Sequence, residues 1–184
     1  TAFKIMALAA ALQQGISLDT NYSSAPYQLP GSDVVTNVGG GCGVCNLREA
    51  TKQSLNTSFL RLQEDLKNGT QDTADMAHAL GVAKSLPGIE KTLTEKGKQP
   101  FEGIVLGQYQ SRPLDMATAM STLANQGVWH NPHFVQRVEN AAGEVLYEHP
   151  EDGGERRVSS NVANNVLEAM EPVAAWSNGA LAGG

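Results

Sequence analysis

A lysine inside a nearly unbroken apolar stretch is the first feature of this sequence that suggests chemistry. Lys4 lies in "TAFKIMALAAALQQG", three residues after the hydroxyl of Thr1. Residues i and i+3 share one face of a helix, so we expect the amine and the hydroxyl one turn apart. Loss of hydration favours neutral lysine, which can take a proton from a hydroxyl and make it a nucleophile. The alternative is a lysine that extends its amine from a helix end into water.

A second pair of polar residues occurs in "QSLNTSF". Ser54 and Asn56 are two residues apart, and side chains at i and i+2 point the same way on extended backbone. The serine hydroxyl can relay a proton, and the asparagine amide can hydrogen-bond a substrate carbonyl. The alternative is a junction between two helices at which either residue serves as a cap.

Two cysteines lie close together in "GGGCGVCNL". For Cys42 and Cys45 the residues leave open a local disulfide, a pair of free thiols, or a redox or metal role. A structural zinc ion needs four ligands, and His130 and His133 do not have the spacing of a zinc finger. We therefore expect no metal site and no cofactor.

Composition and the arrangement of apolar residues limit the functional class. The chain has 184 residues, 41% of them hydrophobic, and a net charge of −6, with no basic stripe for nucleic acid. No run approaches the ~18 apolar residues of a membrane span, and no signal peptide is visible. The abrupt ends suggest an excised piece whose anchor or export signal would lie elsewhere.

Periodicity and turn residues predict mostly helices with one clear hairpin. Glycine or proline marks several boundaries, notably Gly15, Gly69, Pro113 and Gly127. Asn46 is a candidate cap for the second helix, and Asp72 or Thr73 for the fourth. The predicted elements are helices over 3–14, 46–53, 57–69, 72–82, 111–127 and 159–175, a strand over 34–38, an irregular segment over 83–103, and a hairpin over 133–149 around "NAAG".

In this order, the motifs resemble the penicillin-recognising serine acyltransferases, whose signature is S-x-x-K, then S-x-N, then K-T-G. "TAFK" stands where the first motif would be, and "SLN" matches the second. The longer stretches "LREATKQSLNTSFLRL", "SRPLDMATAMSTLANQG" and "WSNGALAGG" are also similar to transpeptidase segments of high-molecular-weight penicillin-binding proteins. The likeness covers nearly the whole chain, and the glycine-rich cysteine pair is similar to actinobacterial class A members.

The resemblance implies an α+β fold of the β-lactamase/transpeptidase type, mostly its helical lobe with part of the sheet. It implies a D,D-transpeptidase that cross-links peptidoglycan stem peptides through an acyl-enzyme and is a target of β-lactams. Residue 1 would be the nucleophile, Lys4 the proton acceptor, Ser54 the proton shuttle and Asn56 the group that orients the acyl donor. The resemblance also implies an exported domain on the outer face of the cell membrane. In such a domain Cys42 and Cys45 would form a disulfide.

Two departures from the family pattern qualify this expectation. The nucleophile position holds Thr1 in place of serine, and no K-T-G occurs in residues 1–184. We therefore expect a partial transpeptidase domain over 1–184 that lacks the C-terminal strands and is a feeble catalyst without them. The rival hypotheses are a β-lactamase or D,D-carboxypeptidase on the same fold, and a non-catalytic scaffold or sensor, which the threonine favours.

Overall fold

The computed structural model describes residues 2–178, and Thr1 lies outside this range. The helices are α1 (Phe3–Gln13), α2 (Leu47–Lys52), α3 (Asn56–Glu64), α4 (Thr70–Leu80), the 3-10 helix η1 (Glu102–Leu106), α5 (Pro113–Ala124), α6 (Ser160–Met170) and α7 (Val173–Asn178). The strands are β1 (Asn21–Ser23), β2 (Tyr27–Gln28), β3 (Val34–Val35), β4 (Val44–Asn46), β5 (Val128–Trp129), β6 (Arg137–Glu139), β7 (Val145–Glu148) and β8 (Glu155–Arg156).

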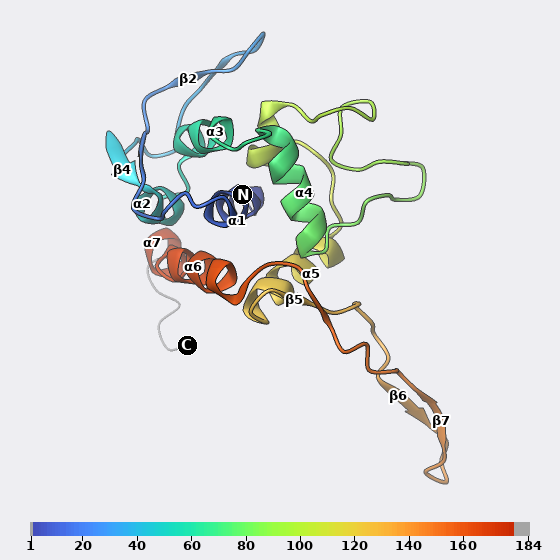
Figure 1. The fold of residues 1–184 in the computed structure, drawn as a ribbon. Coiled ribbons are helices and arrows are strands. Elements are labelled where there is room, and N and C mark those ends of the chain that lie inside the picture. Colours follow the sequence, from blue (N-terminus) through green and yellow to red (C-terminus); the bar gives the residue numbers. More distant parts are fainter. Residues whose placement is uncertain (1, 179–184) are drawn as a thin grey trace.

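Helix α1 forms the centre of the helical body. It is apolar on all sides, and every residue from Phe3 to Ala11 is buried. Helices α3, α4, α6 and η1 pack around it, as Figure 1 shows. The chain leaves the helix through Gly15, whose φ of 89° suits glycine. The predicted first helix is confirmed. No helix within residues 2–178 has both the length and the apolar character needed to cross a membrane.

The strands of the described chain form four separate antiparallel pairs: β1 with β4, β2 with β3, β5 with β8, and β6 with β7. The pair β6–β7 is the predicted hairpin, and it extends away from the helical body (Figure 1). Its turn is closed by Asn140, whose side chain accepts hydrogen bonds from the backbone N–H groups of Ala142 and Glu144. Asparagine in this role is common in turns.

The boundary predicted between the third and fourth helices is wrong. Helix α3 ends at Glu64, and Gly69, with a φ of 54°, precedes α4 instead of following α3. Helix α4 therefore begins before the predicted caps. Asp72 lies within its first turn, where its carboxylate accepts a hydrogen bond of 2.8 Å from the backbone N–H of Asn68. A carboxylate is favourable both at the N-cap and in the first turn of a helix. The presence of Asp72 therefore did not determine where α4 begins.

Two further predicted elements are shorter than expected. The predicted helix over 159–175 is two helices, α6 and α7, with Pro172 between them. Proline lacks an N–H and clashes with the preceding turn, so it interrupts the helix. The strand predicted over 34–38 is paired only at Val34 and Val35, opposite β2.

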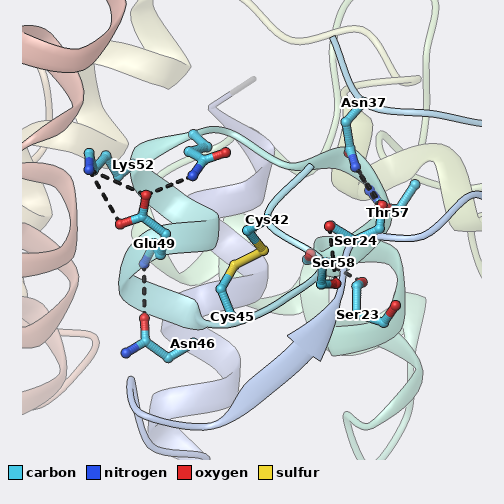
Figure 2. The surroundings of a disulfide bond; sticks show 12 residues. Ser23, Ser24, Asn37, Cys42, Cys45, Asn46, Glu49, Lys52, Thr57 and Ser58 are labelled. Atoms are coloured by element: carbon cyan, nitrogen blue, oxygen red, sulfur yellow. Dashed lines mark hydrogen bonds and ion pairs between the residues drawn. A yellow bond between two sulfur atoms is a disulfide. The ribbon is translucent and has the colours of Figure 1, made fainter. Parts of the chain in front are cut away.

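The segment before α2 is fastened by a disulfide and a helix cap. Cys42 and Cys45 are bonded, as the resemblance implied, with their Cα atoms 5.9 Å apart. One residue later, Asn46 Oδ1 accepts a hydrogen bond of 3.0 Å from the N–H of Glu49 at the start of α2. Figure 2 shows both features. The predicted cap is confirmed, and together the bonds fix how the chain enters α2.

Gly127 provides a stability test because an added Cβ would lie 2.3 Å from the carbonyl oxygen of Val158. Gly127→Ala is expected to lower the unfolding free energy by about 1–3 kcal/mol more than Gly143→Ala, since overpacking adds to backbone strain. Gly143 is a matched control: its φ is also 83°, but nothing lies within 4 Å of an added Cβ. Denaturant melts measure both variants. Equal losses would contradict the close packing of Gly127 against Val158.

Candidate active site

Lys4 lies in the first turn of the central helix, with only 3% of its surface exposed. Its Nζ donates hydrogen bonds to three oxygens from the connection between α2 and α3. The distances are 2.5 Å to the backbone carbonyl of Ser54, 2.9 Å to Ser54 Oγ and 2.7 Å to Asn56 Oδ1. An ammonium has three N–H groups, so the charged form of Lys4 is fully hydrogen-bonded at this place.

Burial acts against that charged form. Removal of water around the amine lowers the pKa of Lys4 from 10.5 to about 8. The fully buried ring of Phe59 lies on one side, its centroid 6.0 Å from Nζ. A substantial fraction of Lys4 is therefore neutral near physiological pH. Neutral lysine has a lone pair, and Ser54 Oγ is close enough to donate its proton to it.

The backbone of Ser54 explains why its side chain reaches the lysine. Its φ is 54°, in the left-handed region where glycine normally ends a helix. The N–H of Leu55 bonds to the carbonyl of Ala50 at 3.0 Å, and the N–H of Ser54 to that of Thr51 at 3.0 Å. These two bonds form the Schellman motif that commonly ends a helix, and Ser54 occupies the left-handed position where glycine is usual. A serine there carries strain of about 1–3 kcal/mol, and such strain is common at functional sites.

Asn56 reaches the same point from the first turn of α3. Leu55 is extended, with φ −70° and ψ 117°, and Asn56 begins the helix. The predicted reason for convergence, an extended Ser-x-Asn triplet, is therefore wrong. The left-handed turn at Ser54 followed by a helix start brings the side chains together instead. Asn56 Nδ2 donates to the carbonyl of Thr36 at 3.1 Å, which fixes the amide with its oxygen toward Lys4.

A hollow of about 310 Å³ opens beside the amine. Most of its wall is apolar, and it includes residues from α1, α2, α3, α6 and α7. Its lining residues are Ala2, Lys4, Ile5, Thr51, Ser54, Phe59, Met170 and Val173. A small ligand in this hollow would lie against Lys4, Ser54 and an apolar surface, an environment that strengthens electrostatic contacts.

The structure thus brings together three of the predicted site residues. Lys4, Ser54 and Asn56 meet within hydrogen-bond distance, and the predicted proximity of Lys4 and Ser54 is confirmed. Thr1, the fourth, lies outside the described residues. Among residues 2–178, no three His, Cys, Asp or Glu side chains are grouped so that they could hold a metal ion. The contact of Thr36 with the site was not predicted, because no motif marks a backbone carbonyl in a loop.

Comparison with known proteins gives the family. The model of the penicillin binding protein transpeptidase domain matches residues 2–183. Penicillin-binding protein 1A of Mycolicibacterium smegmatis is 53% identical over 188 residues, and that of Mycobacterium tuberculosis is 49% identical over 189. Each alignment covers 100% of this chain but only 24% and 23% of the relatives, so the chain spans about a quarter of their length. The expected similarity to actinobacterial members is confirmed by these mycobacterial relatives.

Solved structures give the same answer for the fold. The penicillin-binding protein PonA1 of Mycobacterium tuberculosis superposes with a TM-score of 0.91 and 50% identity, over 99% of this chain and 48% of that one. The same protein in complex with penicillin V gives a TM-score of 0.87 and 51% identity, over 96% of this chain and 47% of that one. The predicted transpeptidase-type α+β fold is confirmed, and the chain belongs to the family of penicillin-binding protein transpeptidase domains.

Proposed function

We propose that this chain forms part of the active site of a D,D-transpeptidase that cross-links peptidoglycan stem peptides and is acylated by β-lactams. The observation that carries the proposal is the buried Lys4 amine in contact with both Ser54 Oγ and Asn56 Oδ1. A lysine with a pKa lowered to about 8, beside a proton-relaying hydroxyl, is suited to activate a nucleophile. The family membership and the penicillin V complex of a relative support the same function.

The first half of the reaction forms the acyl-enzyme. The hydroxyl oxygen of residue 1 attacks the carbonyl carbon of the penultimate D-Ala, and its proton passes to neutral Lys4. The tetrahedral intermediate then expels the terminal D-Ala as its C–N bond breaks. Ser54 passes the proton from Lys4 to the leaving nitrogen, for which its 2.9 Å contact with Nζ is suited. With a β-lactam, the lactam C–N bond breaks in the same way, but the amine stays attached.

The second half transfers the acyl group to the amine of a neighbouring stem peptide. Lys4 and Ser54 remove a proton from the attacking amine, and the ester to residue 1 breaks and restores its hydroxyl. Asn56 orients the acyl donor throughout. Its Nδ2 uses one N–H for the Thr36 carbonyl, and the second N–H is the donor for the amide carbonyl of the substrate. The family's K-T-G motif is not among residues 1–184, so the proposal covers the part of the site that these residues form.

The substrate also determines where the reaction takes place. Cross-linking of peptidoglycan occurs outside the cell membrane, so we place this domain on the extracytoplasmic face. The Cys42–Cys45 disulfide supports that placement, because disulfides persist in oxidising compartments. Stem peptides and β-lactams are the partners in this proposal.

The test of the function is labelling of the full chain, meaning the protein together with the family's K-T-G segment, with a fluorescent penicillin, followed by mass spectrometry to locate the label. Stable label on residue 1 supports a transpeptidase. Rapid loss of label indicates a β-lactamase or D,D-carboxypeptidase, and no label indicates a scaffold. Label located on Ser54 instead would contradict the roles proposed here.

Thr1→Ser is expected to raise the acylation rate about 2- to 10-fold. The methyl group of threonine restricts χ1, and an unfavourable rotamer costs about 0.5–1.5 kcal/mol, which corresponds to that range. Thr94→Ser, remote from Lys4 in the irregular segment, is the control and should leave the rate unchanged. Equal rates for Thr1→Ser and the parent would show that the methyl group does not hinder attack.

A further inference from the structure

The start of helix α3 lacks a cap from its own chain segment. Leu55 stands at the N-cap position and has no polar side chain, so the first N–H groups of the helix need acceptors from elsewhere. One acceptor comes from twenty residues earlier: Asn37 Oδ1 accepts a hydrogen bond of 3.1 Å from the N–H of Thr57. Asn37 therefore caps the helix that carries Asn56, and Figure 2 shows its side chain directed at Thr57.

The remaining contacts of Asn37 fix which end of its amide faces the helix. Its Nδ2 donates to the carbonyl of Ser24 and to Thr57 Oγ1, both at 2.9 Å. Rotation of the amide by half a turn would place its oxygen against the Ser24 carbonyl and its N–H groups against the Thr57 N–H. Both contacts would then be repulsive, so only one orientation is compatible with the neighbours.

The peptide next to Asn37 is the one that touches the active site. The carbonyl of Thr36 accepts from Asn56 Nδ2 at 3.1 Å, while Asn56 Oδ1 faces Lys4 at 2.7 Å. Anchoring of Asn37 therefore holds both the start of the helix and the carbonyl that sets the rotation of the Asn56 amide.

The loop around Asn37 has little else to hold it at this point. After Val38 come Gly39, Gly40 and Gly41, and glycine gives the chain maximal freedom. The next fixed point is the Cys42–Cys45 disulfide, beside which the N–H of Ser24 donates to the carbonyl of Gly43 at 2.8 Å. Asn37 Nδ2 bonds to the carbonyl of that same Ser24, which directly follows β1. The Asn37 amide therefore links its own loop to the end of β1 and to the start of α3.

From these contacts we propose that Asn37 is a positioning residue for acylation: it caps α3 and sets the Thr36 carbonyl so that Asn56 keeps its amide oxygen on Lys4 and its N–H toward the acyl donor. The proposal rests on the function proposed above for Asn56. The side chain of Asn37 is hydrogen-bonded to Ser24 and Thr57, and to neither Lys4 nor Ser54. It acts on the rate indirectly, through its hydrogen bonds to Thr57 and through the position of the Thr36 carbonyl that holds Asn56.

The first test is Asn37→Ala in the full chain with Thr1→Ser as parent, measured as the rate constant and the final stoichiometry of acylation by a fluorescent penicillin. We expect the rate constant to fall about 10- to 100-fold, as for a misplacement near 1 Å, while every folded molecule is still acylated at the end. Asn37→Asp keeps an acceptor for the Thr57 N–H but places an oxygen against the Ser24 carbonyl, so it should also be slower than the parent. Asn165→Ala removes an asparagine side chain whose Nδ2 bonds to Asn161 within α6, and it should match the parent.

Two results would contradict the proposed role of Asn37. A rate constant at the parent's level with only a lower melting temperature would assign Asn37 a purely structural role and overturn the proposal. A rate constant for Asn37→Asp equal to that of the parent would show that the bond from Nδ2 to the Ser24 carbonyl is not needed, and would also overturn it.

A second measurement separates this proposal from the proposed function. If the parent is not acylated at all, the transpeptidase function fails, but a crystal structure of Asn37→Ala still decides the role of Asn37. We expect the 2.7 Å contact between Lys4 Nζ and Asn56 Oδ1 to be lost, with α1 unchanged. If Asn56 keeps its contacts with both Lys4 and Thr36 in that structure, Asn37 does not position it.

Discussion

Replacement of Lys4 by methionine in the full chain is expected to reduce the rate of acylation by a fluorescent penicillin about 10²- to 10⁴-fold, the usual contribution of a general base. Methionine has a similar length and fits the apolar surroundings of α1, but it cannot accept a proton. The oxygens of Ser54 and Asn56 that lose their donor lie on an exposed and a half-buried residue, where water can replace the amine. The loss is therefore expected in the chemical step.

Two checks keep this result interpretable. Lys67→Met removes an exposed lysine elsewhere and should acylate at the parent's rate. The thermal midpoint of Lys4→Met should equal or exceed that of the parent, because a buried amine is replaced by an apolar side chain. A folded Lys4→Met protein that acylates at the parent's rate would reduce Lys4 to a buried structural residue and remove the basis of the mechanism.

Local signals in the sequence predicted the elements that depend on local physics. Helix α1 follows from an apolar run ended by Gly15, and α5 begins at Pro113 as predicted. The hairpin follows from alternation around Asn140 and Gly143. In each case the residues at the boundary or turn favour one backbone conformation over the others. The local sequence was therefore sufficient to predict these elements.

The errors occurred where several residues competed for one role. Gly69, Thr70, Asp72 and Thr73 all suit a helix boundary, and α4 begins at Thr70, directly after Gly69. The predicted helix over 159–175 runs through Pro172, which instead separates α6 from α7. The correct choice depends on which side chains the neighbouring helices bury, and that information is not local.

The candidate active site was predicted through resemblance more than through geometry. The sequence indicated which residues belong together, but the extended triplet expected at 54–56 is a left-handed turn at Ser54 and a helix start at Asn56. The contacts of Asn37 and Thr36 were not predictable at all. They join segments twenty residues apart through a glycine-rich loop that has no periodic pattern.

The pH dependence of acylation is expected to follow the titration of Lys4. Its pKa is lowered by burial to about 8, and only the neutral amine can accept the proton of the nucleophile. The neutral fraction is about 1% at pH 6 and about 90% at pH 9, so the second-order rate constant should rise about 90-fold over this range. The rise should be about tenfold per unit below pH 7 and level off above pH 8. A profile that is flat from pH 6 to 9 would show that Lys4 is not the base.

Folding stability distinguishes this titration from a general effect of alkaline pH. The folded pKa of Lys4 lies below the unfolded value of 10.5, so the unfolded chain binds more protons between pH 8 and 10.5. The contribution of Lys4 to the unfolding free energy therefore increases across that window. Tyr27 acts in the opposite sense above pH 10, because burial and its bond to Glu64 raise its pKa to about 12. In Lys4→Met the gain between pH 8 and 10 should disappear together with the rise in acylation rate. Loss of one without the other would mean that the group titrating near pH 8 is not Lys4.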